Sequence, residues 1–267
     1  AISVLLAGIL LKLGVYGILR INYGLMPDGV YWFSGALAAL GLINVIWGGL
    51  CALAQTDLKK LVAYSSVNHM GYSLIGMAAI VAAGEANGMN LKAAQAGLGG
   101  AVFQMFNHGT ISAMLFILVG VIYDRAHHRD IEGFGGLAAQ MPIYTGITAL
   151  AFFAGLGLPG FSGFISEAMC FIGAFPVYRG IVIASTIGIL LNAAYFLWAF
   201  QRIFFGELNE KYTDLPEINR LELFTVVPLL VITLFFGIYP APYLDIIAST
   251  MDEIIHHVVS LATFAGM

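Results

Sequence analysis

Charge is scarce in this sequence. Only 10% of its 267 residues are Asp, Glu, Lys or Arg, whereas soluble domains carry about 25%. The two cysteines, Cys51 and Cys170, both lie inside apolar runs, where a thiol usually packs as a small hydrophobic group, so neither a disulfide scaffold nor a redox centre is expected. The net charge is −4 and basic blocks are lacking, which excludes nucleic-acid binding. With 60% hydrophobic residues and a mean hydropathy of +0.91, the chain is predicted to be a membrane protein.

Long apolar runs predict an all-α polytopic membrane protein with about seven transmembrane helices. A helical span needs about 20 apolar residues, twice the length of a barrel strand, and these runs do not alternate as barrel strands do. The run 142–175 is too long for one straight span and contains Gly155-Leu-Gly-Leu-Pro-Gly-Phe-Ser-Gly163 in its middle, so we expect a helix that is broken inside the membrane. The predicted segments are 1–20, 31–54, 60–82, 97–123, 142–175, 179–201 and 223–240, followed by 242–264.

The last of these segments, 242–264, carries Asp245, Asp252, Glu253, His256 and His257 along its length. These polar residues favour an interfacial helix over an eighth span. The sequence also begins inside an apolar run without an initiator Met, and we expect it to be a fragment of a longer membrane protein.

The basic residues predict the orientation, because Lys and Arg accumulate in cytoplasmic loops. One set of loops holds seven of them and the other set three, which places the start of the first helix in the cytoplasm. The cytoplasmic set is Lys59, Lys60, Arg125, Arg129, Arg202, Lys211 and Arg220, and the outer set is Arg20, Lys92 and Arg179.

Four ionisable residues remain inside the predicted spans: Lys12, His69, His108 and Glu167. A charge near the bilayer centre costs on the order of 3 kcal/mol, so such residues persist mainly where they line a hydrated path or pair with one another. At 1.5 Å per residue, the lysine and both histidines lie roughly 12 to 16 Å from the nearest predicted helix end, and the glutamate follows the break. All four are of types that burial brings toward neutral pKa values, which predicts a proton relay.

Polar residues that are able to hold water or hydrogen bonds accompany both histidines. Around His69 they are Ser65, Ser66, Asn68 and Tyr72, and around His108 they are Gln104, Asn107, Thr110 and Ser112. Either histidine taken alone is more often a satisfied core residue, and the buried Lys and Glu have a structural ion pair as their alternative. Lys59 and Lys60 are interpreted as edge anchors that are able to feed protons into the path.

Three other motifs are set aside. Gly155-x-Gly157-x-x-Gly160 matches a dinucleotide fingerprint, but no strand precedes it and Pro159 occupies the turn. The pair His127-His128 lacks the i, i+4 spacing of helical metal ligands, and His256-His257 lacks it too. No paired Cys, haem-spaced His or P-loop is present in the sequence, so neither a metal nor a cofactor is expected in this chain.

Four segments carry a family resemblance: Leu11-Lys12-Leu-Gly-Val-Tyr-Gly-Ile-Leu-Arg20, Ala54 to Tyr72 with its Lys-Lys-Leu-Val-Ala-Tyr-Ser-Ser stretch, Gln104-Met-Phe-Asn-His-Gly109, and Ala126-His-His-Arg-Asp130. From residue 1 to about 245, the chain resembles the antiporter-like proton-translocating subunits of respiratory complex I, in particular the M type, called chain 4 in mitochondria. Mrp-type sodium/proton antiporter subunits share the pattern less closely.

This resemblance implies both an architecture and roles. It implies that residues 31–203 form the second of two inverted five-helix repeats, that 1–20 is the last helix of a truncated first repeat, that 204–241 is a cytoplasmic loop with the final span, and that 242–267 is the interfacial helix. By the same resemblance, Lys12, His69 and His108 match the buried polar axis, Glu167 matches the carboxylate at the proton exit, and Lys59 matches a lysine at the cytoplasmic helix end. The input half of the family's path is not among these residues.

Three functions stay open at this point. The first is a proton-pumping subunit of NADH–quinone oxidoreductase, with L-, N- and K-type membrane subunits, lipid and protons as partners, in a bacterial inner membrane rather than a mitochondrial or thylakoid one. The second is an Mrp-type cation/proton antiporter subunit, and membrane-bound hydrogenases carry similar subunits. The third is a structural module whose buried charges dock neighbouring subunits.

Overall fold

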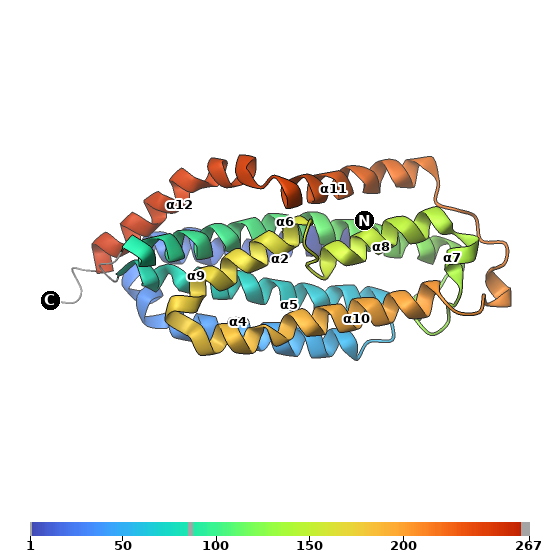
Figure 1. The fold of residues 1–267 in the computed structure, drawn as a ribbon, viewed down its shortest axis with the longest axis horizontal. Helices are drawn as coiled ribbons and strands as arrows, with labels where there is room; N and C mark the ends of the chain where they lie inside the picture. The colour runs from blue at the N-terminus through green and yellow to red at the C-terminus, as the bar shows by residue number, and fades with distance from the viewer. Residues whose placement is uncertain (1, 85–87, 263–267) are drawn as a thin grey trace.

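Helices lie side by side along one long axis in the computed structural model, which describes residues 2–84 and 88–262 (Figure 1). Within these residues the extended structure is limited to one isolated bridge between Asp57 and Asp130. The helices longer than ten residues are α4 (Pro27–Leu53), α5 (Leu58–Ala78), α6 (Gly88–Ala126), α8 (Pro142–Gly155), α9 (Ser162–Ser185), α10 (Ile187–Phe204), α11 (Arg220–Ile238) and α12 (Ala241–Ala262). The shorter ones are α1 (Ile2–Leu5), η1 (Leu6–Leu10), α2 (Leu11–Gly17), η2 (Ile18–Asn22), α3 (Tyr23–Leu25), η3 (Ala79–Gly84), α7 (Leu137–Gln140) and η4 (Glu210–Tyr212).

Six helical stretches of the described chain are long and apolar enough to cross a membrane. The first five short elements run together as one of them, Ile2–Leu25, which is longer than the predicted 1–20. Another is Ser162–Phe204, in which the backbone leaves helical geometry at Tyr178 (φ −115°, ψ 45°) and the chain turns back from α9 into α10 (Figure 1). This stretch therefore contains the second half of the predicted crossing 142–175 and the whole of the predicted crossing 179–201. The predicted all-helical membrane fold is confirmed.

Helix ends follow local sequence signals. Asp57 precedes α5, and its carboxylate accepts a hydrogen bond from the Lys60 amide at 3.1 Å, which satisfies one of the free N–H groups of the first turn. Pro27 and Pro142 stand at the first positions of α4 and α8, where the missing amide costs nothing. Asn219 and Glu222 form a reciprocal capping box at the start of α11. These caps lie at the ends of the predicted spans, so they help to define where each crossing begins.

The predicted break in run 142–175 is present between α8 and α9. Two glycines with positive φ, Gly157 (+78°) and Gly160 (+101°), reverse the backbone there, a conformation that side chains with a Cβ rarely adopt. The Leu158 amide donates to the Phe153 carbonyl and the Phe161 amide donates to the Leu158 carbonyl, so the loop satisfies part of its own backbone. α8 and the first part of α9 therefore form one discontinuous span, and the break between them lies about halfway along the bundle (Figure 1).

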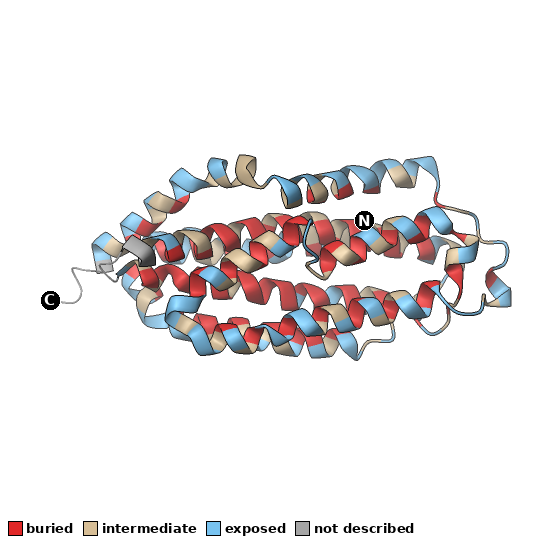
Figure 2. Ribbon diagram, in the orientation of Figure 1, coloured by how far each residue is buried: buried red, intermediate tan, exposed pale blue. Residues whose placement is uncertain are grey.

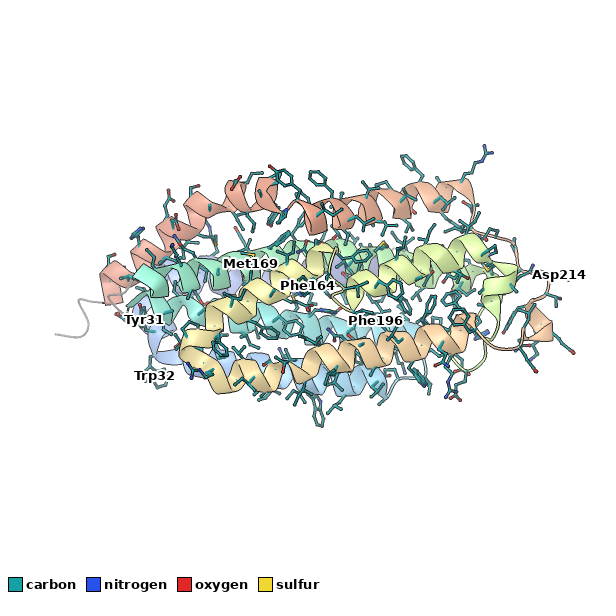
Figure 3. The ribbon with its side chains drawn as sticks, viewed as in Figure 1. Tyr31, Trp32, Phe164, Met169, Phe196 and Asp214 are labelled. Atoms are coloured by element: carbon teal, nitrogen blue, oxygen red, sulfur yellow. The ribbon has the colours of Figure 1, made fainter. Side chains whose placement is uncertain are left out.

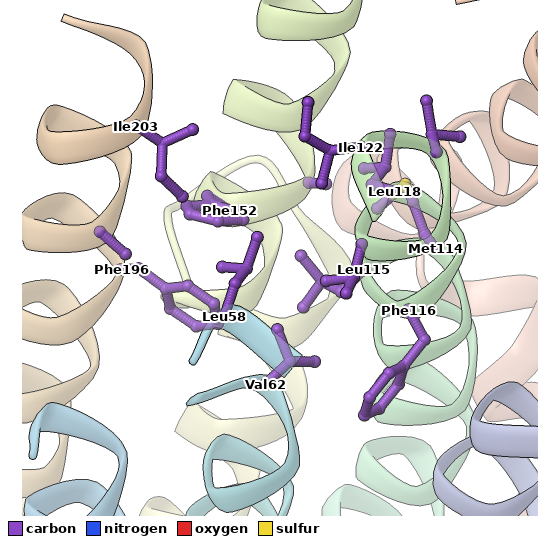
Figure 4. Close-up of a cluster of buried hydrophobic side chains, with 14 of the residues drawn as sticks. Leu58, Val62, Met114, Leu115, Phe116, Leu118, Ile122, Phe152, Phe196 and Ile203 are labelled. Atoms are coloured by element: carbon purple, nitrogen blue, oxygen red, sulfur yellow. The ribbon is translucent and has the colours of Figure 1, made fainter. Parts of the chain in front are cut away.

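Buried residues line the inner faces of the bundle, and exposed residues line its outside (Figure 2). One cluster of aliphatic and aromatic side chains, including Leu58, Leu115 and Phe152, fills the half that contains α8 (Figure 4). Elsewhere the helices meet through glycine. A Cβ added at Gly173 of α9 would come within 2.3 Å of the Gly97 Cα on α6, and one added at Gly76 of α5 would come within 2.7 Å of the Gly97 carbonyl oxygen. The backbones of α5, α6 and α9 are therefore in direct contact.

The predicted cytoplasmic end is held by ionic contacts. Arg125 at the end of α6 makes a two-pronged pair with Glu222 of α11, at 2.7 and 2.9 Å, and donates further bonds to the Pro216 and Glu217 carbonyls. The Glu217 carboxylate in turn accepts from the first free amides of α8 at 2.8 and 3.1 Å. Asp214 lies at this end of the bundle, and Tyr31 and Trp32 lie at the opposite end (Figure 3).

The C-terminal helix α12 follows Pro240 and continues obliquely toward the outer end of the bundle (Figure 1). Tyr243 stacks on Phe103 and Phe106 of α6, with ring centroids 5.0 and 4.8 Å apart, and Asp252 accepts a hydrogen bond from Gln95 at 2.7 Å. One face of this helix therefore packs on α6. Its predicted interfacial position, like the predicted repeat boundaries, stays a prediction.

Candidate functional site

The centre of the bundle holds a histidine–glutamate pair. His69 on α5 and Glu167 on α9 meet through Nδ1 and Oε1 at 3.0 Å, and both residues are buried, at 5% exposure each. A proton shared over this distance moves between the imidazole and the carboxylate without a further carrier. Two residues that lie 98 positions apart in the sequence are thus joined, and their role in a relay stays a prediction.

The second predicted histidine lies beside the first. The rings of His108 on α6 and His69 have centroids 5.3 Å apart. His108 is buried, and its Nδ1 has no hydrogen-bond partner among the described residues. Buried nitrogens in this state are commonly satisfied by ordered water.

A short hydrogen-bonded chain holds the glutamate from the α6 side. Gln104 Nε2 donates to Glu167 Oε1 at 3.4 Å, and the Ser166 hydroxyl donates to Gln104 Oε1. Asn107 Nδ2 donates to the Ser162 carbonyl at 2.9 Å and to the Ser166 hydroxyl oxygen at 3.0 Å. The side-chain amides of Gln104 and Asn107 therefore hold the first turns of α9, and they hold the Glu167 carboxylate in position as well.

The helix break touches the same carboxylate. A Cβ added at Gly157 would lie 2.9 Å from Glu167 Oε2. The loop thus approaches the carboxylate at a place where a side chain would not fit. Because Gly157 has no Cβ, the loop leaves the space that Glu167 Oε2 occupies.

Lys12 is buried on α2, with 8% of its surface exposed. Its ammonium donates to the Ala7 carbonyl of its own helix, and no acidic partner faces it in the described chain. A largely apolar groove of about 620 Å³ runs past it, with Gly8, Met105 and Gly109 among the lining residues. The structure therefore places Lys12 beside α6, without a direct contact to the His69–Glu167 pair.

Lys59 lies in the first turn of α5, half-buried, at the predicted cytoplasmic end. It precedes His69 by ten residues on the same helix, which is about 15 Å of rise. The structure does not bring it into contact with the relay. It stays a predicted input residue.

Several polar neighbours have roles other than those expected from their position. Asn68 was predicted to support His69, but its Nδ2 donates to the Val45 carbonyl of α4 at 2.6 Å. The hydroxyls of Ser65, Ser66, Thr110 and Ser112 donate to carbonyls of their own helices. Gln104, expected near His108, bonds Glu167 instead.

The sequence analysis missed a polar group on α10. Asn192 and Tyr195 are fully buried, and the Tyr195 hydroxyl donates to Asn192 Oδ1 at 2.8 Å. The signal was present as a single amide inside the apolar run 179–201. Ser162 and Ser166, near the break, were also overlooked.

The two histidine pairs that were set aside above each have a member in contact with a neighbouring segment of the protein. His128 stacks on Phe134 with ring centroids 4.3 Å apart, and its Nε2 meets the Tyr212 hydroxyl. His257 Nε2 lies 3.0 Å from the Gly24 carbonyl oxygen. Among the described residues, no group of three or more His, Cys, Asp or Glu side chains is arranged to hold a metal ion.

The chain is similar to known membrane proteins. The family model described as NADH:quinone oxidoreductase/Mrp antiporter, TM, matches residues 1–192. The chain belongs to this family. It is 40% identical to NADH-quinone oxidoreductase subunit M of Rhodobacter capsulatus over 256 residues, which cover 96% of this chain and 48% of that protein. It is 37% identical to F(420)H(2) dehydrogenase subunit M of Methanosarcina mazei, over 97% of this chain and 49% of that one.

Solved structures of the NADH:quinone oxidoreductase/Mrp antiporter type have the same fold. A chain of respiratory complex I from Thermus thermophilus superposes with a TM-score of 0.80 at 26% identity, covering 91% of this chain and 50% of that one. A chain of the Mrp complex from a Dietzia species superposes with a TM-score of 0.76 at 20% identity, covering 93% and 53%. The chain spans about half the length of the relatives it matches.

Proposed function

We propose that this chain forms the proton-conducting part of an antiporter-like membrane subunit, in which a proton passes from Lys12 through His108 and then His69 to Glu167. The observation that carries the proposal is the buried hydrogen bond between His69 Nδ1 and Glu167 Oε1, with the second imidazole beside it and the helix break against the carboxylate. Ionisable groups buried inside a membrane are rare, and ion pathways and proton relays are among the functions they mark.

Each group has a distinct part in this mechanism. Protonated Lys12 releases its proton through water to His108, the next predicted group of the axis. His108 then passes a proton through a water between the imidazoles to His69. His69 then exchanges it with Glu167 across their hydrogen bond. The discontinuous span places free backbone amides and carbonyls next to the carboxylate, which helps water to reach it from the outer side. No cofactor in this chain takes part.

We propose that the whole protein, called the parent below, works in a complex that oxidises NADH with a quinone, as the names of its relatives suggest. There it would contact L-, N- and K-type membrane subunits in a bacterial inner membrane, and quinone reduction elsewhere would drive the charge movement. The alternative is an Mrp-type cation/proton antiporter, which the family description also covers, or a membrane subunit of a hydrogenase.

The test uses the full-length parent in its native membranes, with Glu167→Gln as the variant. NADH-driven acidification of inverted vesicles is measured against the rate of quinone reduction. The expected result is loss of this subunit's share of pumping while electron transfer and assembly persist. Glu210→Gln, an exposed carboxylate on the cytoplasmic segment, is the matched control and is expected to pump normally.

Two results would contradict the proposal. Unchanged pumping in Glu167→Gln would remove the carboxylate from the path and leave the buried charges with a structural role. Proton movement driven by a sodium gradient, in membranes that show no NADH-dependent pumping, would favour the antiporter alternative.

A further inference from the structure

Unpartnered polar atoms gather on the side of the relay that faces α10. Tyr72 of α5 and Asn192 of α10 are both fully buried and lie next to each other, yet neither the Tyr72 hydroxyl nor Asn192 Nδ2 makes a hydrogen bond of good geometry with the described residues. Leaving such groups unpaired costs about 1 to 3 kcal/mol each, so native proteins fill these places with ordered water. Two neighbouring atoms in this state indicate a hydrated site.

Helical spacing brings these groups onto facing surfaces. Ser65, His69 and Tyr72 follow one another at i, i+4 and i+7, so they share one face of α5. Gly188, Asn192 and Tyr195 repeat the same spacing on α10. A Cβ added at Gly188 would lie 2.6 Å from the Tyr72 hydroxyl oxygen, which shows that this hydroxyl reaches the α10 backbone one turn before Asn192.

The row is continuous with the relay. The rings of Tyr72 and His69 have centroids 6.1 Å apart, and Tyr72 is held edge-on against Phe171 at 5.4 Å. From Tyr72 the row passes to Asn192, and from there through the hydroxyl of Tyr195 toward the level of Ser65. Ser65 precedes Tyr72 by seven residues, which is about 10 Å toward the predicted cytoplasmic end.

Two other buried tyrosines show that an unpaired hydroxyl, as at Tyr72, is not general for buried tyrosines in this fold. The hydroxyl of Tyr23 donates to the Met77 carbonyl at 2.8 Å, and that of Tyr144 donates to the Leu118 carbonyl at 2.9 Å. Both of these hydroxyls are satisfied by the protein, as buried hydroxyls normally are. The Tyr72 hydroxyl is left for a ligand as small as water.

We infer that Tyr72, Asn192 and Tyr195 hold bound water and form a branch of the proton path, which joins the His69–Glu167 pair and follows the α5–α10 contact toward Ser65. This inference rests on the proposed function. Water in this row accepts from Asn192 Nδ2, exchanges a hydrogen bond with the Tyr72 hydroxyl and extends the path beyond the two imidazoles. Tyr72 and Tyr195 pass protons through their hydroxyls while remaining neutral.

The test is Tyr72→Phe in the full-length parent within its complex, because this change removes the hydroxyl and keeps the ring. The expected result is a lower ratio of protons translocated to NADH oxidised, with an unchanged or higher melting temperature. The double variant Tyr72→Phe/Glu167→Gln is expected to lose no more pumping than Glu167→Gln alone, since both lie on one path. Tyr23→Phe and Tyr144→Phe are the controls: each removes a bonded hydroxyl, so each should melt lower and pump normally.

Normal pumping in Tyr72→Phe overturns the branch, whereas normal pumping in Glu167→Gln overturns the proposed function as well. If the Tyr72→Phe complex does not assemble, a high-resolution map of the unsubstituted complex decides the question. Density for water between the Tyr72 hydroxyl and the Asn192 amide supports the branch. A dry contact there, in a map that resolves water elsewhere, refutes it.

Discussion

The absent Cβ at Gly157 is open to a direct test through Gly157→Ala. Gly157 has a φ of +78°, and the added Cβ would meet Glu167 Oε2 at 2.9 Å. Ordinary contact begins at 3.4 Å, so the oxygen must retreat by about 0.5 Å. A carboxylate at the end of a flexible side chain makes this movement easily. The movement relieves the clash but shifts the Glu167 carboxylate away from its position against His69.

The magnitudes separate two effects. Placing a residue with a Cβ in the left-handed region costs about 1 to 2 kcal/mol of stability. A displacement of 1 Å can slow a positioned reaction about a hundredfold, so half of that distance is expected to slow proton exchange between His69 and Glu167 on the order of tenfold. Gly160→Ala is the matched control, because Gly160 also has a positive φ (+101°) but nothing lies within 4 Å of its added Cβ.

Both variants are made in the full-length parent, with pumping and quinone reduction measured in vesicles and stability measured by thermal melting. Both are expected to melt at a lower temperature, and only Gly157→Ala is expected to pump poorly. Equal pumping by the two variants would refute a positional role for the Gly157 contact. A pumping loss shared by both would assign the effect to the loop backbone rather than to the carboxylate.

Two further predictions concern the packing of the helices. Arg125→Ala leaves Glu222 without its two-pronged partner, in a place where the two side chains are 9% and 21% exposed, and is expected to lower the free energy of unfolding by about 2 to 3 kcal/mol; Arg125→Lys should restore only part of it, since lysine cannot bond both oxygens in the same plane. Gly173→Ala forces backbone apart at Gly97 and is expected to cost about 2 to 3 kcal/mol. Gly180→Ala, with nothing within 4 Å, should stay within about 1 kcal/mol of the parent. Thermal melting of the complex checks all of these, and equal melting temperatures for the two glycine variants would contradict the close contact between α6 and α9.

The break and the buried titratable residues were predictable because each leaves a mark in one dimension. Pro159 with its flanking glycines interrupts an apolar run that is too long for one span, and His69, His108 and Glu167 are conspicuous in such runs. The rise per residue places them at similar depth, and the structure brings these three together. Residue type and depth were therefore enough to select these residues from the sequence.

Rotation about each helix axis was not predictable in the same way. Helices that are apolar on all sides carry no stripe to indicate which face meets which neighbour. Gln104 was therefore assigned to His108 by sequence distance, although it faces Glu167 on another helix. Asn192 was not predicted as a functional residue, because the role of a single amide in an apolar run depends on which residue of a neighbouring helix it faces.

The glycine contacts among α5, α6 and α9 also limit how the relay is able to move. Gly76, Gly97 and Gly173 bring the backbones of the three helices that carry His69, His108 and Glu167 into contact, and such contacts leave no room for one helix to slide past another. The three helices are thus packed backbone against backbone at these points. We therefore expect the hydrogen bond of the pair to switch through side-chain rotation and movement of the loop at 156–161, rather than through shifts of whole helices, which take microseconds to milliseconds.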